Sequence, residues 1–248
     1  MDYSELVNDN RQRDGLFGVY PGVVADIEDP ENMARVKVKF PWRDADDKSE
    51  WARMATPMAG KKMGTYFLPE KNDEVLVAFG EGDIHEPYIV GSLWDGKMKP
   101  PQQNKKKNPI RQIKSRAGHT VTFDDTDDVG KIEIETKKGQ KVVIDDKNEK
   151  ITIKDKNKNE IKMDSNGIAI DSKETISLSG KKVTVEGEKE VSLSGQKLNA
   201  TAKSKANIAS KGQLSLSAKA KAMLQANGML DVKSSGMLKM KGSMIMLN

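Results

Sequence analysis

Residues 176–193 read ISLSGKKVTVEGEKEVSL, and in this stretch the apolar side chains come in pairs two residues apart. The pairs are Ile176/Leu178, Val183/Val185 and Val191/Leu193, and each begins seven or eight residues after the one before it. Because successive side chains of an extended strand point to opposite faces, both members of a pair lie on one face. The pattern therefore predicts a series of short strands that all bury the same face.

The paired pattern extends in both directions, from Ile132 to Leu247, with steps of seven to ten residues that settle to eight. A short fixed period is typical of solenoid-like architectures. The region also lacks proline, which fits an unbroken ladder of backbone hydrogen bonds. Two aliphatic residues per strand, with no aromatic residue, are too few to fill a single-chain β-helix. Three chains winding about one axis enclose a thinner core, so we expect an intertwined trimeric β-helix, or β-prism.

The predicted trimer core consists of apolar pairs from this repeat. Its members are Ile176, Leu178, Val183, Val185, Val191, Leu193, Leu214, Leu216, Leu230, Val232, Leu238 and Met240. Segments 202–211 and 217–228 are rich in Ala and Lys, so a helix or a solvated low-complexity chain is the competing interpretation. The apolar pairs keep their spacing through both segments, however, and a helix would scatter them around its circumference.

The first hundred residues differ in composition from the rest of the chain. They hold 11 of the 12 aromatic residues, and their net charge is −6 (13 basic, 19 acidic), against +11 (29 basic, 18 acidic) afterwards. Five short runs rich in Val, Ile and aromatic residues, bounded by Gly, Pro and Asp, predict a small all-β barrel over residues 15–98. We expect its core to contain Val36, Val38, Phe40, Trp42, Val75, Val77 and Phe79, with Trp51 and Trp94 also adding buried area.

Few residues are suited to catalysis or metal binding. There is no cysteine, and His85 and His119 are the two histidines. The acidic stretches 26–31 and 44–47 and the run Asp124–Asp128 could offer carboxylates to a cation, but their spacing is typical of turns. We predict no catalytic, cofactor-binding or metal-ligating residue and no enzyme activity; ion binding by His119 or the acidic loops stays open. With no membrane span or signal peptide in the sequence, we expect synthesis in the cytoplasm.

The basic excess is steepest after Glu190, where nine lysines face one acidic residue, Asp231. Such a tract could attract the phosphates of nucleic acid or of anionic lipid. It contains no aromatic residue on which bases could stack. We therefore predict no specific nucleic-acid partner, and an OB-fold nucleic-acid binder with a basic tail is the less favoured alternative.

The first half resembles the OB-fold of central spike proteins, the family of phage baseplate assembly protein V, phage tail spikes and the VgrG proteins of type VI secretion. Residues 113–126 are similar to the start of the β-helix in the same family. The motifs that carry the resemblance to the OB-fold are Gly22-Val23-Val24, residues 36–42, Trp51-Ala52-Arg53, residues 64–69, residues 73–79, Gly82-Asp83, Pro87 and Gly91-Ser92-Leu93. The expected organisation is an extension (1–14), an OB-fold domain (15–98), a linker (99–115) and an octad-repeat spike (116–248).

The resemblance implies a non-enzymatic homotrimer that transiently punctures a target-cell membrane in a contractile injection machine. About 14 residues precede the barrel, so we expect a separate hub protein at that end, and the linker has no room for a lysozyme domain. A PAAR-type tip protein is expected to cover Met244, Ile245, Met246, Leu247 and Asn248. We expect assembly into a phage tail, tailocin or type VI-like particle, with release outside the cell as one outcome. The alternative is a trimeric receptor-binding fibre or adhesin.

Overall fold

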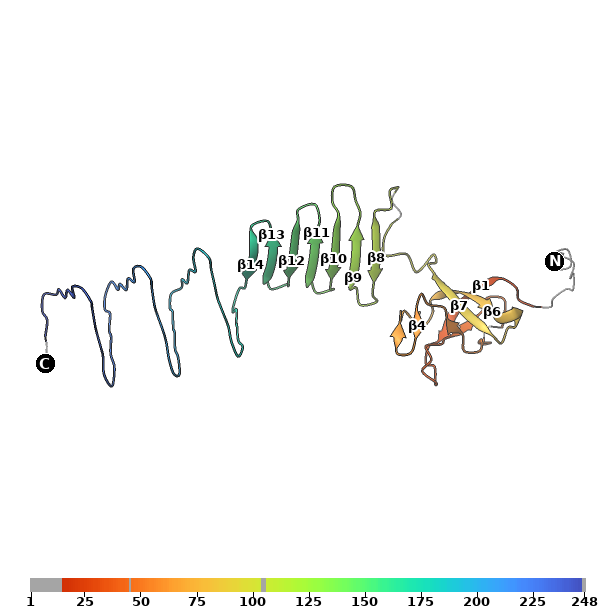
Figure 1. Cartoon of the computed structure of the whole chain (residues 1–248). Coiled ribbons are helices and arrows are strands. Elements are labelled where there is room, and N and C mark those ends of the chain that lie inside the picture. Colours follow the sequence, from red (N-terminus) through yellow and green to blue (C-terminus); the bar gives the residue numbers. More distant parts are fainter. Residues whose placement is uncertain (1–14, 45, 104–105, 247–248) are drawn as a thin grey trace, which may run out of the picture. The chain divides into compact units, whose positions relative to one another are not determined.

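The computed structural model describes residues 15–44, 46–103 and 106–246 of the chain (Figure 1). Over these ranges the secondary structure consists of β-strands and one 3-10 turn, η1 (Gly80–Gly82). The prediction of an all-β fold is confirmed. Two compact units divide the chain after Ser177, and each is described by itself below.

The N-terminal domain is built on a five-stranded sheet whose strand order is β2-β1-β6-β7-β3. Its neighbours are antiparallel except for the parallel pair β3 and β7. A separate two-residue hairpin, β4 with β5, projects from the segment between β3 and β6. The bounds are β1 (Val19–Asp26), β2 (Lys37–Lys39), β3 (Arg53–Met54), β4 (Ala59–Gly60), β5 (Met63–Gly64), β6 (Glu74–Phe79) and β7 (Pro87–Leu93).

The core of this domain follows from alternation along its strands. In β6, Val75, Val77 and Phe79 are buried while the residues between them are half-buried. The buried apolar cluster comprises Val24, Val36, Val38, Phe40, Ala52, Val75, Val77, Phe79 and Ile89. It contains every predicted barrel-core residue except Trp42.

Two tryptophans, Trp42 and Trp94, were expected to be buried but are exposed. Trp42 is 47% exposed; it lies beyond the end of β2, where its ring stacks on Phe40 at 5.1 Å and lies 5.9 Å from the ring of Tyr20, both measured between centroids. Trp94 is 70% exposed, directly after the end of β7. Both residues therefore belong to the surface of the single chain rather than to the barrel core.

The second sheet is an antiparallel meander of seven strands in sequence order, β8 to β14 (Figure 1). Each strand has five residues, so the nine- to ten-residue steps of the early repeat correspond to one strand plus one hairpin turn. The first strand begins at Ile110, inside the segment predicted to be a linker. The bounds are β8 (Ile110–Lys114), β9 (Thr120–Asp124), β10 (Lys131–Glu135), β11 (Lys141–Asp145), β12 (Lys150–Lys154), β13 (Glu160–Asp164) and β14 (Gly167–Asp171).

The C-terminal unit, residues 178–248, follows the eight-residue repeat. Along its chain, bends recur at 203–204, 211–212, 219–220, 227–228 and 235–236. Within its described part, up to residue 246, no strand is assigned and no backbone-to-backbone hydrogen bond closes inside the chain. The β-helix strands expected here are thus not formed within the described part of one chain.

Candidate functional site

One face of the meander sheet is a continuous apolar surface, because the strand register aligns the i, i+2 pairs. Ile144 of β11 lies opposite Ile132 of β10 and Ile151 of β12. On the same strand, Val142 lies opposite Ile134 and Ile153. The two rows continue across the sheet through Phe123, Met163 and Ile168 in one and through Ile113, Val121, Ile161 and Ile170 in the other.

This apolar face has no cover in the single chain. The isoleucines on it are between 36% and 71% exposed. Exposed apolar area of this extent on a soluble domain marks an interaction surface. The sequence predicted the pairs, while the alignment of the pairs into rows depends on the hairpin turns between the strands.

The opposite face is polar and satisfied within the chain. Lys141 Nζ lies 2.7 Å from Glu133 Oε1 and 3.3 Å from Glu135 Oε2. Partial burial acts to raise the pKa of Glu133, but the hydrogen bond and positive charge of Lys141 outweigh it and hold that pKa below its ordinary value. The pKa of Lys141 is correspondingly raised: burial acts to lower it, but the hydrogen bonds to Glu133 and Glu135 and their negative charges together outweigh burial. The charged groups on the polar face thus pair within the chain, whereas the isoleucines on the apolar face are uncovered in the single chain.

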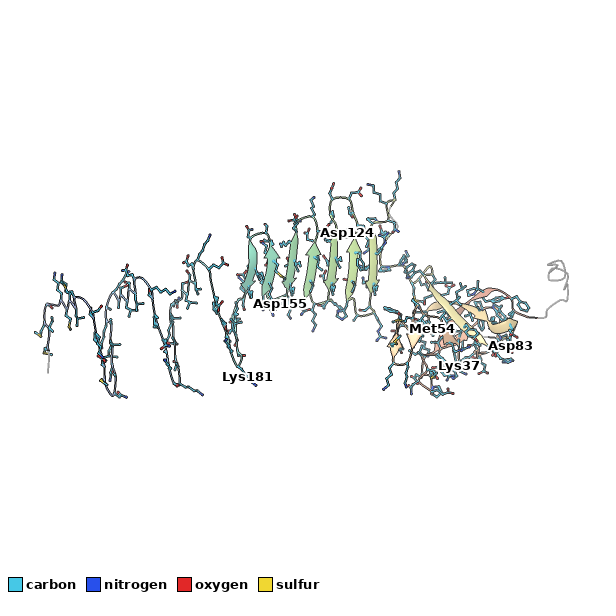
Figure 2. The ribbon with its side chains drawn as sticks, in the orientation of Figure 1. Lys37, Met54, Asp83, Asp124, Asp155 and Lys181 are labelled. Atoms are coloured by element: carbon cyan, nitrogen blue, oxygen red, sulfur yellow. The ribbon has the colours of Figure 1, made fainter. Side chains whose placement is uncertain are left out.

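The apolar pairs of the octads are also uncovered. The predicted trimer-core residues from Ile176 to Met240 are all between 51% and 85% exposed in the single chain. Figure 2 shows that side chains along this segment stand away from the chain. Among the predicted tip residues, Met244, Ile245 and Met246 are 77%, 49% and 80% exposed, whereas Leu247 and Asn248 lie outside the described residues.

A second apolar surface, which the sequence interpretation missed, lies on the N-terminal domain. The β4–β5 hairpin borders a hollow of about 1010 Å³. Four of its lining side chains, Met33, Met63, Tyr66 and Phe67, are between 62% and 74% exposed. The signal for this surface was the density of methionine and aromatic residues between positions 54 and 67, a segment with little strand pattern.

The loop that carries Met33 is held by a buried carboxylate. The Asp29 side chain is 3% exposed and accepts hydrogen bonds from the backbone N–H groups of Glu31, Met33 and Arg35. The guanidinium of Arg35 also donates to it, at 2.7 and 3.0 Å, and this contact first of all holds the pKa of Asp29 well below its ordinary value. Within the acidic stretch 26–31, Asp29 therefore forms an internal ion pair with Arg35.

Three other candidate ion ligands also have partners within the chain. Asp125 pairs with Arg111 and Asp127 with Lys107 in the turn between β9 and β10. The Nδ1 atom of His119 accepts a hydrogen bond from the backbone N–H of Lys137 at 3.3 Å. In the described portion of the chain, no three His, Cys, Asp or Glu side chains form a group that could hold a metal ion.

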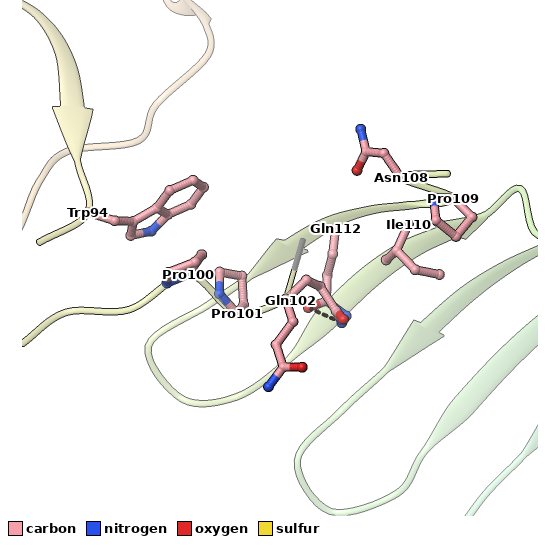
Figure 3. A pocket seen from close by; sticks show the side chains of 9 residues that line it. Trp94, Pro100, Pro101, Gln102, Asn108, Pro109, Ile110 and Gln112 are labelled. Atoms are coloured by element: carbon pink, nitrogen blue, oxygen red, sulfur yellow. Dashed lines mark hydrogen bonds between the residues drawn. The ribbon is translucent and has the colours of Figure 1, made fainter. Parts of the chain in front are cut away.

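A smaller hollow of about 230 Å³ lies beside the first residues of β8 (Figure 3). Trp94, three prolines, Ile110 and amide side chains line it, and Gln102 Nε2 donates a hydrogen bond to Gln112 Oε1 at 3.3 Å. Among the described residues that line this hollow there is no acidic, basic or imidazole side chain, so these residues offer no group for acid–base chemistry. A helix long and apolar enough to cross a membrane is also absent from the residues described.

Two family comparisons match separate parts of the chain. Residues 20–94 match the type VI secretion system/phage-baseplate injector OB domain, and residues 131–190 match the phage baseplate V C-terminal trimerisation domain. The second match covers β10 to β14 and the first octads, where the uncovered apolar pairs lie. It supports a homotrimer.

Individual relatives agree with these matches. The type VI secretion system spike proteins VgrG1a and VgrG5 of Pseudomonas aeruginosa are 30% identical over 116 residues and 31% identical over 118 residues, covering 44% and 46% of this chain. VgrG3 of Vibrio cholerae is 38% identical over 68 residues, or 26% of this chain. The matches cover 17%, 14% and 7% of these relatives, respectively, so the chain accounts for less than a fifth of their length.

Proposed function

Because this chain belongs to the central spike family that includes phage baseplate assembly protein V and the VgrG spike proteins, we propose that it is the membrane-puncturing spike of a contractile injection machine. The family is one of structural spike proteins. In this proposal three copies wind their octads about a shared axis, and the function is mechanical rather than enzymatic. The rod transmits the force of contraction to a target membrane.

The observation that carries the proposal is the set of uncovered apolar side chains, which lie on one face of the meander sheet and, separately, on the octads. The isoleucine rows and the pairs such as Val191/Leu193 find no cover in one chain. Each pair buried around a threefold axis would gain hydrophobic stabilisation, about 1.5–3 kcal/mol for each fully buried aliphatic side chain. Strands that pair with other copies would also satisfy the backbone groups of 178–246, and a fully laddered rod resists bending.

The mass of the particle in solution tests the trimer directly. We expect light scattering to give three times the chain mass of 27.4 kDa, and an unboiled sample to migrate as a trimer in SDS. Val191→Asp should abolish the trimer because three carboxylates would be buried together, at a cost of several kcal/mol each. Leu238→Asp near the C-terminal end should act in the same way.

The matched control is Ser192→Asp, which lies between Val191 and Leu193 and would face the opposite side in the proposed strand. It adds the same charge on the outside of the proposed rod, so the trimer should persist. A wild-type mass equal to one chain, or loss of the trimer in Val191→Asp and Ser192→Asp alike, would contradict the proposal.

Two partners complete the proposed spike. We place a hub protein on the N-terminal domain, where the hollow beside the β4–β5 hairpin exposes Met63, Tyr66 and Phe67. We place a tip protein over the apolar end formed by residues 244–248, including Ile245. Assembly into a phage-tail-like particle follows from these two contacts. Met63→Lys should weaken capture of the hub without changing the trimer mass, and deletion of residues 244–248 should do the same for the tip protein.

A further inference from the structure

The hollow beside the start of β8 combines an exposed indole ring with carboxamide side chains (Figure 3). Trp94 is 70% exposed, although the tryptophan ring is among the largest apolar surfaces that a side chain offers. The other polar side chains of the described lining are the carboxamides of Gln102, Gln103, Asn108 and Gln112, and none of the described lining residues is ionisable. The hollow thus offers one flat apolar ring together with neutral hydrogen-bond donors and acceptors.

The two neighbouring strands hold the walls of this hollow in place. Trp94 follows directly after β7, and Gln112 lies within β8, opposite Thr122 of β9. The carboxamide of Gln112 is fixed at both of its polar atoms: Nε2 donates a hydrogen bond to Thr122 Oγ1 at 2.8 Å, and Oε1 accepts one from Gln102 at 3.3 Å. Three prolines in the lining add rigidity, because the proline ring locks φ. A pre-formed lining of this kind lowers the entropic cost of binding a ligand.

Several polar groups of the lining remain open to a ligand. Among the described residues, the side chains of Gln103 and Asn108 form no hydrogen bond, and the Nε1–H group of Trp94 has no acceptor. Gln102 uses its Nε2 atom in the bond to Gln112, which leaves its Oε1 atom as an acceptor. A ligand in the hollow can therefore both donate hydrogen bonds to the lining and accept them from it.

This combination matches a neutral sugar. In a β-glucopyranoside the ring substituents are equatorial, so each face of the ring presents axial C–H groups that pack flat against an indole. The hydroxyls around the ring donate and accept hydrogen bonds, as carboxamides do. An ionised ligand would lose its hydration without gaining a charged partner from this lining. The hollow of about 230 Å³ is smaller than the pockets of about 300–1,000 Å³ that enclose drug-sized ligands, so it takes one sugar ring rather than a chain.

We propose that the hollow lined by Trp94, Gln102 and Gln112 binds one neutral pyranose ring at the end of a glycan. Trp94 supplies the stacking surface, and the carboxamides fix the orientation of the ring through its hydroxyls. The inference goes beyond the mechanical role proposed above and does not depend on it, because all the residues that form this site belong to one chain and lie outside the octads.

Saturation-transfer difference NMR on the full-length protein tests the proposal, with methyl β-D-glucopyranoside and methyl N-acetyl-β-D-glucosaminide as the probes. We expect magnetisation transfer to the ring protons of at least one glycoside, with millimolar affinity because the hollow is small and open. Trp94→Ala should weaken binding roughly ten-fold, whereas Trp94→Phe keeps an aromatic face and should retain most of it. Gln102→Ala removes one carboxamide from an exposed position and should also weaken binding.

The matched control is Tyr66→Ala, which removes an aromatic ring that is 74% exposed elsewhere on the N-terminal domain and should leave the transfer unchanged. Light scattering on every sample shows the state of association, so failure of the proposed trimer is distinguished from failure of sugar binding. A wild-type protein that transfers magnetisation to neither glycoside overturns the proposal, and so does a Trp94→Ala variant that binds as well as the wild type. Transfer to a proline-rich peptide but to neither glycoside would assign the hollow to peptide binding instead.

Discussion

Replacing Ile144 with alanine tests whether the uncovered sheet face contributes to association between copies or only to the fold of one chain. Ile144 lies on the apolar face of β11, between Ile132 and Ile151. Its neighbour in sequence, Val143, lies on the other face, opposite Glu133 and Thr152. We expect Ile144→Ala to weaken association of the three copies much more than Val143→Ala does.

The size of the effect follows from exposure. Removal of a fully buried isoleucine side chain down to alanine costs about 2–5 kcal/mol. Ile144 is 45% exposed in the single chain, so a little under half of its surface remains for other copies to cover. Ile144→Ala should therefore reduce the free energy of association by about 1–2 kcal/mol per copy, or about 3–6 kcal/mol for a trimer. Because each 1.4 kcal/mol is a factor of about ten, the association constant should fall by roughly 10²–10⁴.

Two measurements together give the difference in association between Ile144→Ala and Val143→Ala. One is the temperature at which the SDS-resistant trimer converts to single chains, and the other is the mass by light scattering over a dilution series. Val143→Ala controls for loss of volume within the sheet itself, since Val143 and Ile144 are both aliphatic residues of one strand. Equal weakening of association by the two variants would refute the reasoning, because the apolar rows would then have no special part in the contact between copies.

Two further predictions concern the N-terminal domain. Asp29→Asn should destabilise it at neutral pH; since Arg35 holds the pKa of Asp29 below the ordinary 3.8, the stability it contributes is present above that value and is lost as the pH falls below it. Denaturant unfolding across pH should show the variant and the wild type converging in acid, and a constant difference would argue against the ion pair. Gly22→Ala should cost about 1–3 kcal/mol, because the added Cβ would lie 2.4 Å from Cγ1 of the buried Val38, whereas Gly91→Ala meets nothing within 4 Å. Thermal unfolding distinguishes them, and equal melting temperatures for the two variants would contradict the packing argument.

Local pattern was sufficient for many elements of this protein. The alternation in residues 74–79 placed Val75, Val77 and Phe79 on one face of a strand, and the i, i+2 pairs marked strands β10 to β14, whereas β8 lies inside the predicted linker and the later pairs correspond to no strand in the described residues. Trp42 and Trp94 could not be placed in this way, because hydrophobicity alone does not say whether a large ring at the end of a strand turns inward. The buried Asp29 was equally invisible, since its partner Arg35 approaches only when the loop closes.

The sequence by itself determined the all-β class, the apolar pairs and the eight-residue period, because side-chain alternation and repeat length are local properties of an extended backbone. Tertiary structure alone decided the register between strands, and with it the joining of Ile132, Ile144 and Ile151 into one row. It also decided where the chain pairs with itself, as in β8 to β14, and that no strand forms in the described residues after 177. Such pairing is non-local, because a strand's hydrogen bonds go to whichever chain lies beside it.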